Sequence, residues 1–245
     1  MGPGLRRLER MKVVSYNLRK HRAIDELAAL DERYSPDVLC LQEVETVGLA
    51  EHVGRLQLAH STTGNRLGLA VYFRPDRYEF EVVQSFALKK SLHDHLLRPA
   101  HERLIGVRLR DLEADRAFVV ASFHAAPLTA LNSLRRHQIH AALGELARLG
   151  PGLPILMVGD YNYPVFKDNL AVNVRAAGYE LSLSDSRTYT RYKFFRGHFD
   201  LATSVGFDIE RVETLPRGSS DHLPILVDAR YAAATESEVE AAIGA

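Results

Sequence analysis

The chain has 245 residues, 46% of them hydrophobic and 25% charged, and its 31 basic residues are balanced by 31 acidic ones. These values exclude a largely disordered chain and a surface dominated by charge of one sign. Because a local basic face can exist within a neutral total, net charge does not identify a partner.

The first third of the chain predicts a βαβ unit followed by two more strands. A run of β-branched and aromatic residues over 11–19 predicts a strand, a helical pattern follows over 23–34, and a buried strand is predicted over 36–45. A Pro-Asp turn dipeptide at 75–76 divides the strand pattern of 66–83. This division predicts an antiparallel hairpin.

The rest of the chain mixes strands with helices. Weak periodicity predicts a long, partly exposed loop over 84–103. Helices are predicted over 129–150, which ends at a glycine, and over 165–178. Strands are predicted over 104–111, 116–127, 153–164, 198–204 and 223–231. Strands mixed with helical crossovers indicate an α/β (α+β) fold, with two sheets packed together and helices on the outer faces.

We expect one domain over residues 1–245, with a core at about 11–231. Layered folds of this length commonly form one unit, and no repeat, linker or low-complexity tract divides the chain. Residues 1–10 are expected to be a disordered leader, or the result of a translation start assigned upstream of Met11. Residues 232–245 are expected to be a short helix or a frayed tail.

The N-terminus and the cysteine content bear on location. The basic N-terminal residues are followed by a strand pattern instead of the apolar stretch of a signal peptide, and no run of about 18 apolar residues occurs. Cys40 is the one cysteine, which excludes an internal disulfide and suits a small buried hydrophobe in a reducing compartment. We therefore expect a cytoplasmic protein without a membrane span.

Polar side chains collect at the ends of the predicted strands, where a rigid scaffold presents them to a cleft. Each alone has an ordinary explanation, such as a helix cap, a turn or a core histidine. As a set they need another explanation, because buried charges are costly unless paired or metal-bound. The set is Asn17, Glu43, His124, Asp160, Asn162, Asp200, Asp221 and His222.

Part of this set suits a divalent cation. Oxygen ligands such as Glu43, with Asn17 and Asp221 nearby, fit Mg²⁺ or Mn²⁺. No Cys/His spacing indicates a structural zinc site. The sequence therefore predicts a hard-cation site instead of a thiolate site.

The other part suits water and phosphate. Asp160 and Asn162 are two residues apart on one strand, so they share a face and can hold one water together. His222 can stabilise a charged phosphoryl oxygen if a buried carboxylate such as Asp200 keeps it protonated.

Six strings in order resemble the endonuclease/exonuclease/phosphatase superfamily: YNLR, LQEVE, SFHAAP, GDYNYP, HFDLAT and SDHLPI. That superfamily includes DNase I-like nucleases, exonuclease III-like abasic-site endonucleases, inositol polyphosphate 5-phosphatases and neutral sphingomyelinases. The resemblance spans roughly residues 12–229, and G-D-[YF]-N and S-D-H are its most specific elements. Arg19 and His124 make the pattern more similar to the DNase I, phosphatase and sphingomyelinase branches than to abasic-site endonucleases.

The resemblance implies a four-layer α/β sandwich with mainly antiparallel sheets, which hydrolyses phosphate esters with a divalent metal. It implies that Glu43 is the principal metal ligand and that Asn17 helps hold metal or phosphate. It also implies that Asp160 orients or deprotonates the attacking water and that Asn162 positions this water.

The remaining implied roles concern the phosphate. By the same resemblance His124 and His222 contact the scissile phosphate, and Asp200 pairs with His222. Asp221 supports the metal or that histidine.

A basic and aromatic rim is a further expectation. Cations combined with stacking side chains suit nucleic acid, although ordinary exposed loops explain the same residues equally well. The candidate substrate contacts are Arg19, Arg98, Arg103, Tyr189 and Phe194.

The leading functional hypothesis is a Mg²⁺-dependent phosphodiesterase or nuclease, with Mn²⁺ as an alternative cation. The alternative is a phosphatase or a phospholipase C-like hydrolase of an inositol-phosphate or lipid phosphoester, which the zero net charge favours. A third hypothesis is a catalytically silent binding module, but every expected catalytic position is filled. A phosphate ester is the expected substrate, with nucleic acid among the options, and a monomer is the default.

Overall fold

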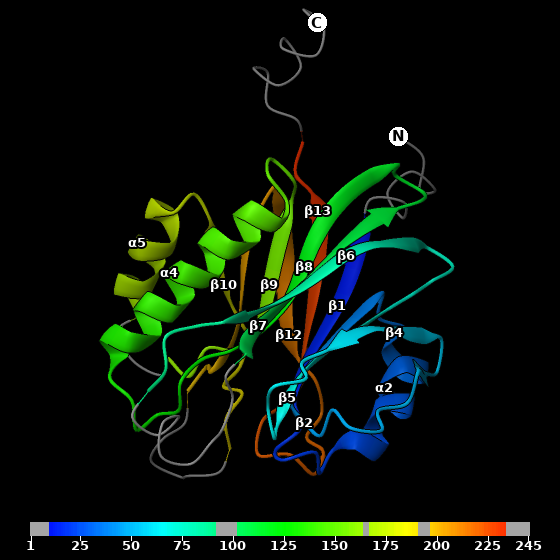
Figure 1. Cartoon of the computed structure of the whole chain (residues 1–245), viewed down its shortest axis with the longest axis horizontal. Coiled ribbons are helices and arrows are strands. Elements are labelled where there is room, and N and C mark those ends of the chain that lie inside the picture. The colour runs from blue at the N-terminus through cyan, green and yellow to red at the C-terminus, as the bar shows by residue number, and fades with distance from the viewer. Residues whose placement is uncertain (1–9, 92–101, 164–166, 191–196, 234–245) are drawn as a thin grey trace, which may run out of the picture.

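The computed structural model describes residues 10–91, 102–163, 167–190 and 197–233, whose strands form two packed sheets (Figure 1). The first sheet has seven strands. In spatial order these are β12 (Phe207–Thr214), β13 (Ile225–Tyr231), β1 (Arg10–Asn17), β2 (Val38–Val44), β5 (Gly68–Phe73), β4 (Leu56–Ser61) and β3 (His52–Val53).

The second sheet has six strands. In spatial order these are β10 (Glu180–Leu183), β11 (Asp200–Val205), β9 (Ile155–Asp160), β8 (Arg116–His124), β7 (Glu102–Asp111) and β6 (Tyr78–Ala87). The pairs β1–β2 and β8–β9 are parallel, and the other pairs are antiparallel. The predicted fold of two packed, mainly antiparallel sheets is therefore confirmed.

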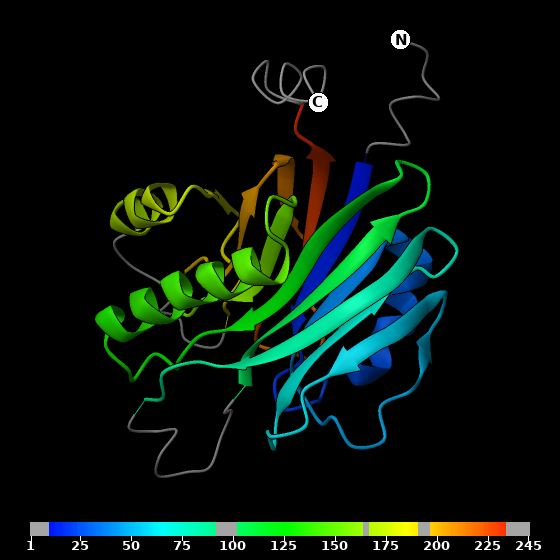
Figure 2. The same cartoon turned by 45° about the horizontal axis from the view of Figure 1, so that its top comes forward.

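Helices cover the two outer faces. The 3-10 turn η1 (Ile24–Glu26) and helix α2 (Leu27–Tyr34) connect β1 to β2 and pack on the first sheet, as the βαβ prediction requires. Helices α4 (Asn132–Leu149) and α5 (Lys167–Ala176) pack on the second sheet. They lie on the opposite side of the molecule from α2 (Figures 1 and 2). The order of the layers is therefore helix, sheet, sheet, helix.

Three apolar clusters fill the spaces between these layers. The cluster between the sheets includes Val13 and Cys40 from the first sheet and Val107, Val120 and Val158 from the second. Cys40 is free and buried, and burial raises the pKa of its thiol. The expectation of a small buried hydrophobe at this position is confirmed.

The segment at 74–77 is a crossing between the sheets, so the prediction of a hairpin was wrong. Strand β5 lies between β2 and β4, whereas β6 pairs with β7 at the edge of the other sheet. All six residues of β5 are buried, which suits an internal strand, whereas most residues of β6 are exposed or half-buried, which suits an edge strand. Arg77 holds the crossing to both sheets through Asp37 (Nη1–Oδ2, 3.1 Å) and Asp111 (Nη2–Oδ2, 3.3 Å).

Other boundaries also differ from the predictions. The expected loop over 84–103 is shorter, because β6 continues to Ala87 and β7 begins at Glu102. Four strands had no prediction: β3, β4, β10 and β12. Residues 1–9, 92–101, 164–166, 191–196 and 234–245 lie outside the described residues, and so do the predictions for Arg98, Phe194, nearly all of the leader and most of the tail. Among the described helices, none combines the length and the apolar character needed to cross a membrane.

Candidate active site

The register of the second sheet places three polar side chains in one row. His124 at the end of β8 pairs with Asp160 at the end of β9, and Asp200 at the start of β11 pairs with the same aspartate. Paired residues in neighbouring strands point to the same face. The adjacent residues Phe123 and Tyr161 belong to the cluster beneath α4 and α5, so the three polar side chains face the first sheet.

Gly159 makes this row possible. Its φ is +146°, and a Cβ at this position would lie 1.9 Å from the carbonyl oxygen of Phe123. That separation is far below any real contact, so β9 approaches β8 this closely only because residue 159 is glycine. The glycine that precedes Asp160 in the GDYN string therefore has a structural cause.

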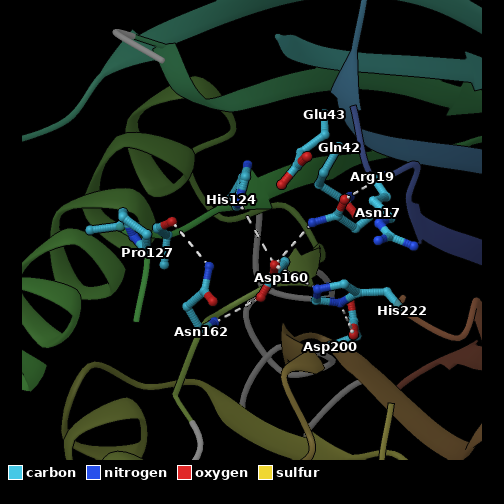
Figure 3. Close-up of polar contacts among 12 residues, drawn as sticks. Asn17, Arg19, Gln42, Glu43, His124, Pro127, Asp160, Asn162, Asp200 and His222 are labelled. Carbon is cyan, nitrogen blue, oxygen red and sulfur yellow. Dashed lines mark hydrogen bonds and ion pairs between the residues drawn. The ribbon is translucent and has the colours of Figure 1, made fainter. Parts of the chain in front are cut away.

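The Asp160 carboxylate lies at the centre of the site (Figure 3). Its Oδ2 accepts a hydrogen bond from Asn17 Nδ2 at 3.0 Å, and His222 Nε2 and His124 Nε2 lie 3.6 and 3.7 Å from the same oxygen. Its Oδ1 accepts a hydrogen bond from the backbone N–H of Asn162 at 2.9 Å. One carboxylate, only 2% exposed, thus joins side chains from both sheets.

His222 forms a dyad with Asp200. Its Nδ1 lies 2.9 Å from Asp200 Oδ2. Burial opposes the charged ring, but the negative charges of Asp200 and Asp160 outweigh this and raise the pKa of His222 to about 10. The ring is therefore an imidazolium at neutral pH, and Nδ1 donates to Asp200.

Asp160 and His124 are shifted in the other sense, towards their neutral forms. Burial, with a contribution from Asp200, raises the pKa of Asp160 to about 7, although His222 and the two amide donors oppose this. Burial, with contributions from Arg103 and His222, lowers the pKa of His124 to about 4. At neutral pH the site therefore holds one charged and one neutral imidazole beside a carboxyl group that can gain or lose a proton.

Glu43 approaches from the first sheet. It lies at a bulge of β2 with φ of +55°, and its Oε2 accepts a hydrogen bond from the backbone N–H of Lys20 at 2.8 Å. The turn that supplies this donor has three successive positive φ angles, at Arg19, Lys20 and His21. Such angles are costly for residues other than glycine and persist only where surrounding contacts impose them. Figure 3 shows the Glu43 carboxylate pointing towards His124 and Asp160.

Two residues that sequence reasoning missed fix the backbone of the site. Ser220 Oγ donates to the carbonyl oxygen of Asn17 at 2.7 Å and accepts from the backbone N–H of His222 at 3.1 Å. Thr188 Oγ1 accepts from the N–H groups of Phe199 and Asp200 at 3.0 and 3.1 Å. The available signal for Ser220 was its place in the SSDH string.

The structure places the remaining candidates at different depths. Arg19 Nε lies 3.5 Å from Asp221 Oδ2, beside the site. The Tyr189 ring packs edge-on against His222, with centroids 5.0 Å apart. Arg103 is only 3% exposed, and its Nη1 donates to the carbonyl oxygens of His124 and Ala125 at 3.0 and 2.9 Å. Arg103 therefore supports the end of β8 from behind and does not lie on a rim.

Residues 14–222 match the Endonuclease/Exonuclease/phosphatase family. The chain belongs to this family. The match includes all the site residues described above, from Asn17 to His222, and the fold has the two mixed sheets and outer helices of its members. Family membership supports hydrolysis of a phosphate ester as the activity, without indicating the substrate.

Individual relatives illustrate the breadth of the family. Protein angel of Drosophila melanogaster is 28% identical over 164 residues, which are 61% of this chain and 44% of that protein. The match thus spans less than half the length of that curated relative. Two solved structures share the fold. A mannosyl-6-phosphatase from Bacteroides thetaiotaomicron has a TM-score of 0.73 and 16% identity, over 90% of this chain and 100% of the other. ANGEL2, described as a 2′,3′-cyclic phosphatase, has a TM-score of 0.67 and 15% identity, over 91% and 96%.

Enzymes of this family usually use divalent metals, and two donor sets are available for one here. Atoms of Asp160, Asp200 and His222 lie within 4.8 Å of one another. Ligation by His222 requires loss of the proton that Asp200 holds on the ring, so this trio fits a charged dyad better than a metal site. Glu43 has no cationic side chain within ion-pair distance among the described residues, and hard cations prefer such oxygens. The Glu43 side of the site therefore fits the metal.

Proposed function

We propose that the protein is a divalent-metal-dependent phosphodiesterase in which an activated water attacks the phosphorus atom in line with the leaving group. Family membership supports phosphoester hydrolysis in general. The observation that carries the proposal is the convergence of Asn17, His124 and His222 on the single carboxylate of Asp160. A proton acceptor surrounded by donors at the edge of two sheets is the arrangement that water activation beside an anion needs.

Asp160 is the group that takes the proton of the water. Its pKa of about 7 lies near the working pH, where a general base combines a sufficient ionised fraction with sufficient basicity. The amide of Asn17 and the backbone N–H of Asn162 fix both carboxylate oxygens. The base is thus held in one orientation before substrate binds.

His222 stabilises the phosphoryl group. As an imidazolium oriented by Asp200, it directs an Nε2–H donor towards the centre of the site, where it can bond to an oxygen on which negative charge develops. The neutral His124 on the other side of Asp160 adds a donor without adding a charge.

Glu43, with the side-chain oxygen of Asn17 nearby, would hold Mg²⁺ or Mn²⁺. When bound, such an ion supplies Lewis-acid polarisation of the phosphoryl oxygens.

The test is hydrolysis of bis-p-nitrophenyl phosphate, a diester, and of p-nitrophenyl phosphate, a monoester, with EDTA and then with added Mg²⁺ or Mn²⁺. We expect cation-dependent hydrolysis of the diester. Glu43→Gln should require far more cation, whereas Glu32→Gln, on the exposed face of α2, should not. Failure to hydrolyse either compound with either cation contradicts the proposal, and hydrolysis of the monoester alone replaces it with the phosphatase alternative.

A further inference from the structure

A cavity of about 570 Å³ adjoins the candidate active site on the side of Tyr189. Its lining is polar and comes from the segment 185–190, from His198 and from the segment that leads to Asp221. The lining residues are Asp185, Ser186, Arg187, Tyr189, Thr190, His198 and Arg217.

The wall of this cavity is also the wall of the catalytic site. Tyr189 forms a β-bridge with His222, and their rings pack against each other. Thr190 donates to the carbonyl oxygen of Asp221 through both its backbone N–H and its hydroxyl, at 2.9 and 3.0 Å. A group in the cavity and a phosphate at His222 are therefore separated by one side-chain layer.

The charges in the cavity favour an anion. Arg187 and Arg217 are exposed, and neither forms an ion pair with another described residue. The one carboxylate of the lining, Asp185, is engaged through Oδ1 by the N–H and hydroxyl of Thr214, both at 2.9 Å. The lining thus contains two guanidinium groups and one carboxylate. A guanidinium group can donate two parallel hydrogen bonds to the oxygens of one phosphate.

The backbone that carries the two arginines is fixed. Residue 188, next to Arg187, is bonded through its N–H to Gly197 O at 3.0 Å and through its carbonyl to the N–H of Leu223 at 2.7 Å. Arg217 lies between Leu215, whose N–H donates to Pro224 O at 2.8 Å, and residue 219, whose N–H donates to Glu26 Oε1 at 2.6 Å. Anchored backbone lowers the entropic cost of binding, as a preformed site requires.

We propose that the Arg187–Arg217 cavity binds a second phosphate group of the substrate, beside the phosphate that is hydrolysed. This inference rests on the proposed function, since it places a phosphoester at His222. It narrows the substrates to molecules with at least two phosphate groups. Neighbouring phosphates of a nucleic acid strand and phosphates around an inositol ring share this chemistry.

The test compares ligands that differ by one phosphate. Isothermal titration calorimetry in EDTA, which removes the proposed catalytic cation, measures binding of thymidine dinucleotide with and without a 5′-phosphate, and of an inositol bisphosphate and monophosphate. The protein should prefer the two-phosphate member of at least one pair. Arg187→Gln/Arg217→Gln should reduce that preference by at least about tenfold, the scale of one charged hydrogen bond. Arg33→Gln/Arg148→Gln removes the same charge from the outer helices and should leave the preference unchanged.

Each outcome decides the inference. If the double variant loses the preference for the two-phosphate dinucleotide, the second phosphate comes from nucleic acid. If it loses the preference for the inositol bisphosphate, the second phosphate comes from an inositol phosphate. The inference is overturned if the protein prefers neither two-phosphate ligand, or if the double variant weakens one- and two-phosphate ligands equally. Turnover of bis-p-nitrophenyl phosphate tests the proposed function separately, and the double variant should keep it within about twofold. If that substrate is not hydrolysed, the proposed function fails while the binding ratios still decide the second site.

Discussion

Two clusters of buried charge join the sheets at opposite ends of the strands. The pairing of β1 with β2 places Asp37 at the beginning of this parallel pair and Asn17 at its far end. The first cluster consists of Asp37, Arg77 and Asp111, and the second surrounds Asp160. Both contain acids and bases removed from water, yet they are satisfied to different degrees.

In the cluster around Arg77 the carboxylates are well supplied with donors. Asp37 accepts from the N–H of Lys12 at 2.8 Å as well as from Arg77, and Asp111 Oδ1 accepts from the N–H groups of Glu113 and Ala114 at 3.0 and 3.1 Å. Such a cluster compensates the loss of hydration of its carboxylates. It has a structural purpose and leaves little capacity for a ligand.

Several polar groups in the cluster around Asp160 lack good hydrogen-bond partners. Two imidazole rings lie 3.6 and 3.7 Å from one oxygen, too far for good hydrogen bonds, and Asp200 Oδ1 is buried without a hydrogen-bond partner among the described residues. Burial and neighbouring charges shift the pKa values of Asp160, His124 and His222 away from their usual range. Incomplete pairing with perturbed titration is typical of sites that receive protons or ligands.

The largest effect is expected from Asp160→Asn, which keeps the size of the side chain and removes the base. The rate of phosphodiester hydrolysis should fall by at least about two orders of magnitude, the usual contribution of a general base. The melting temperature should stay within about 5 °C, since a change of 1 kcal/mol corresponds to a few degrees at this size. Asp168→Asn, on the exposed face of α5, is the matched control. Near-normal turnover by Asp160→Asn would show that another group activates the water.

Arg77→Met should give the converse result at the other cluster. It leaves the fully buried Asp111 without its cation, whereas Asp37 keeps Arg74 (Nη1–Oδ1, 3.3 Å), and an uncompensated buried charge costs about 3–5 kcal/mol. Urea denaturation should show that loss in the free energy of unfolding, whereas kcat per folded molecule should be unchanged under native conditions. A variant with normal stability and impaired kcat would mean that the two clusters do not divide structure and catalysis as described.

Sequence patterns located the second cluster better than the first. Each residue of the Asp160 site lies at the end of an apolar strand pattern or in a short string typical of the family, so its place could be predicted locally. Arg77 follows the turn dipeptide at 75–76, which looks the same whether the chain returns in one sheet or crosses to another. Which of these occurs depends on the partners of β5 and β6, and these come from distant parts of the chain.

The supports of the site were similarly out of reach. Thr188 bonds backbone groups 11 and 12 residues away and Ser220 a carbonyl 203 residues away, and a hydroxyl that caps such groups has no periodicity of its own, although Ser220 stands in the SSDH string. Arg103 was interpreted as a rim residue because it follows a polar stretch, whereas the start of β7 carries it behind His124. Strand register determines the place of Arg103, and the packing of loops determines the contacts of Thr188 and Ser220; single-sequence patterns specify neither.

The pH dependence tests how the Asp160 cluster divides its charges. Activity should rise as Asp160 loses its proton near pH 7 and fall as His222 loses its proton near pH 10. Asp200 raises both pKa values, so Asp200→Asn should move both limbs of the profile to lower pH, by roughly one to three units for His222. NMR titration of the His222 ring in the metal-free protein measures that shift directly. An unmoved alkaline limb would exclude the dyad as its cause.

The same titration predicts a change in stability. Because the pKa of His222 is higher in the folded protein than in the unfolded chain, its contribution to stability is complete below about pH 6.5 and is lost as the pH rises towards 10. Asp200→Asn should flatten this part of the curve of unfolding free energy against pH.

The smallest effect is expected at the turn that holds Glu43. The backbone N–H of His21 donates to Glu43 O at 2.8 Å, and its imidazole Nδ1 accepts from the backbone N–H of Glu45 at 3.0 Å, so the imidazole fixes the chain two residues after the proposed metal ligand. His21→Ala should raise the Mg²⁺ concentration for half-maximal activity by about tenfold while kcat at saturating Mg²⁺ is retained, as expected when a group that orients a ligand is removed. His52→Ala, an exposed histidine on β3, should leave the Mg²⁺ requirement unchanged. A fall in kcat that excess Mg²⁺ does not restore would place His21 in the reaction itself instead of behind Glu43.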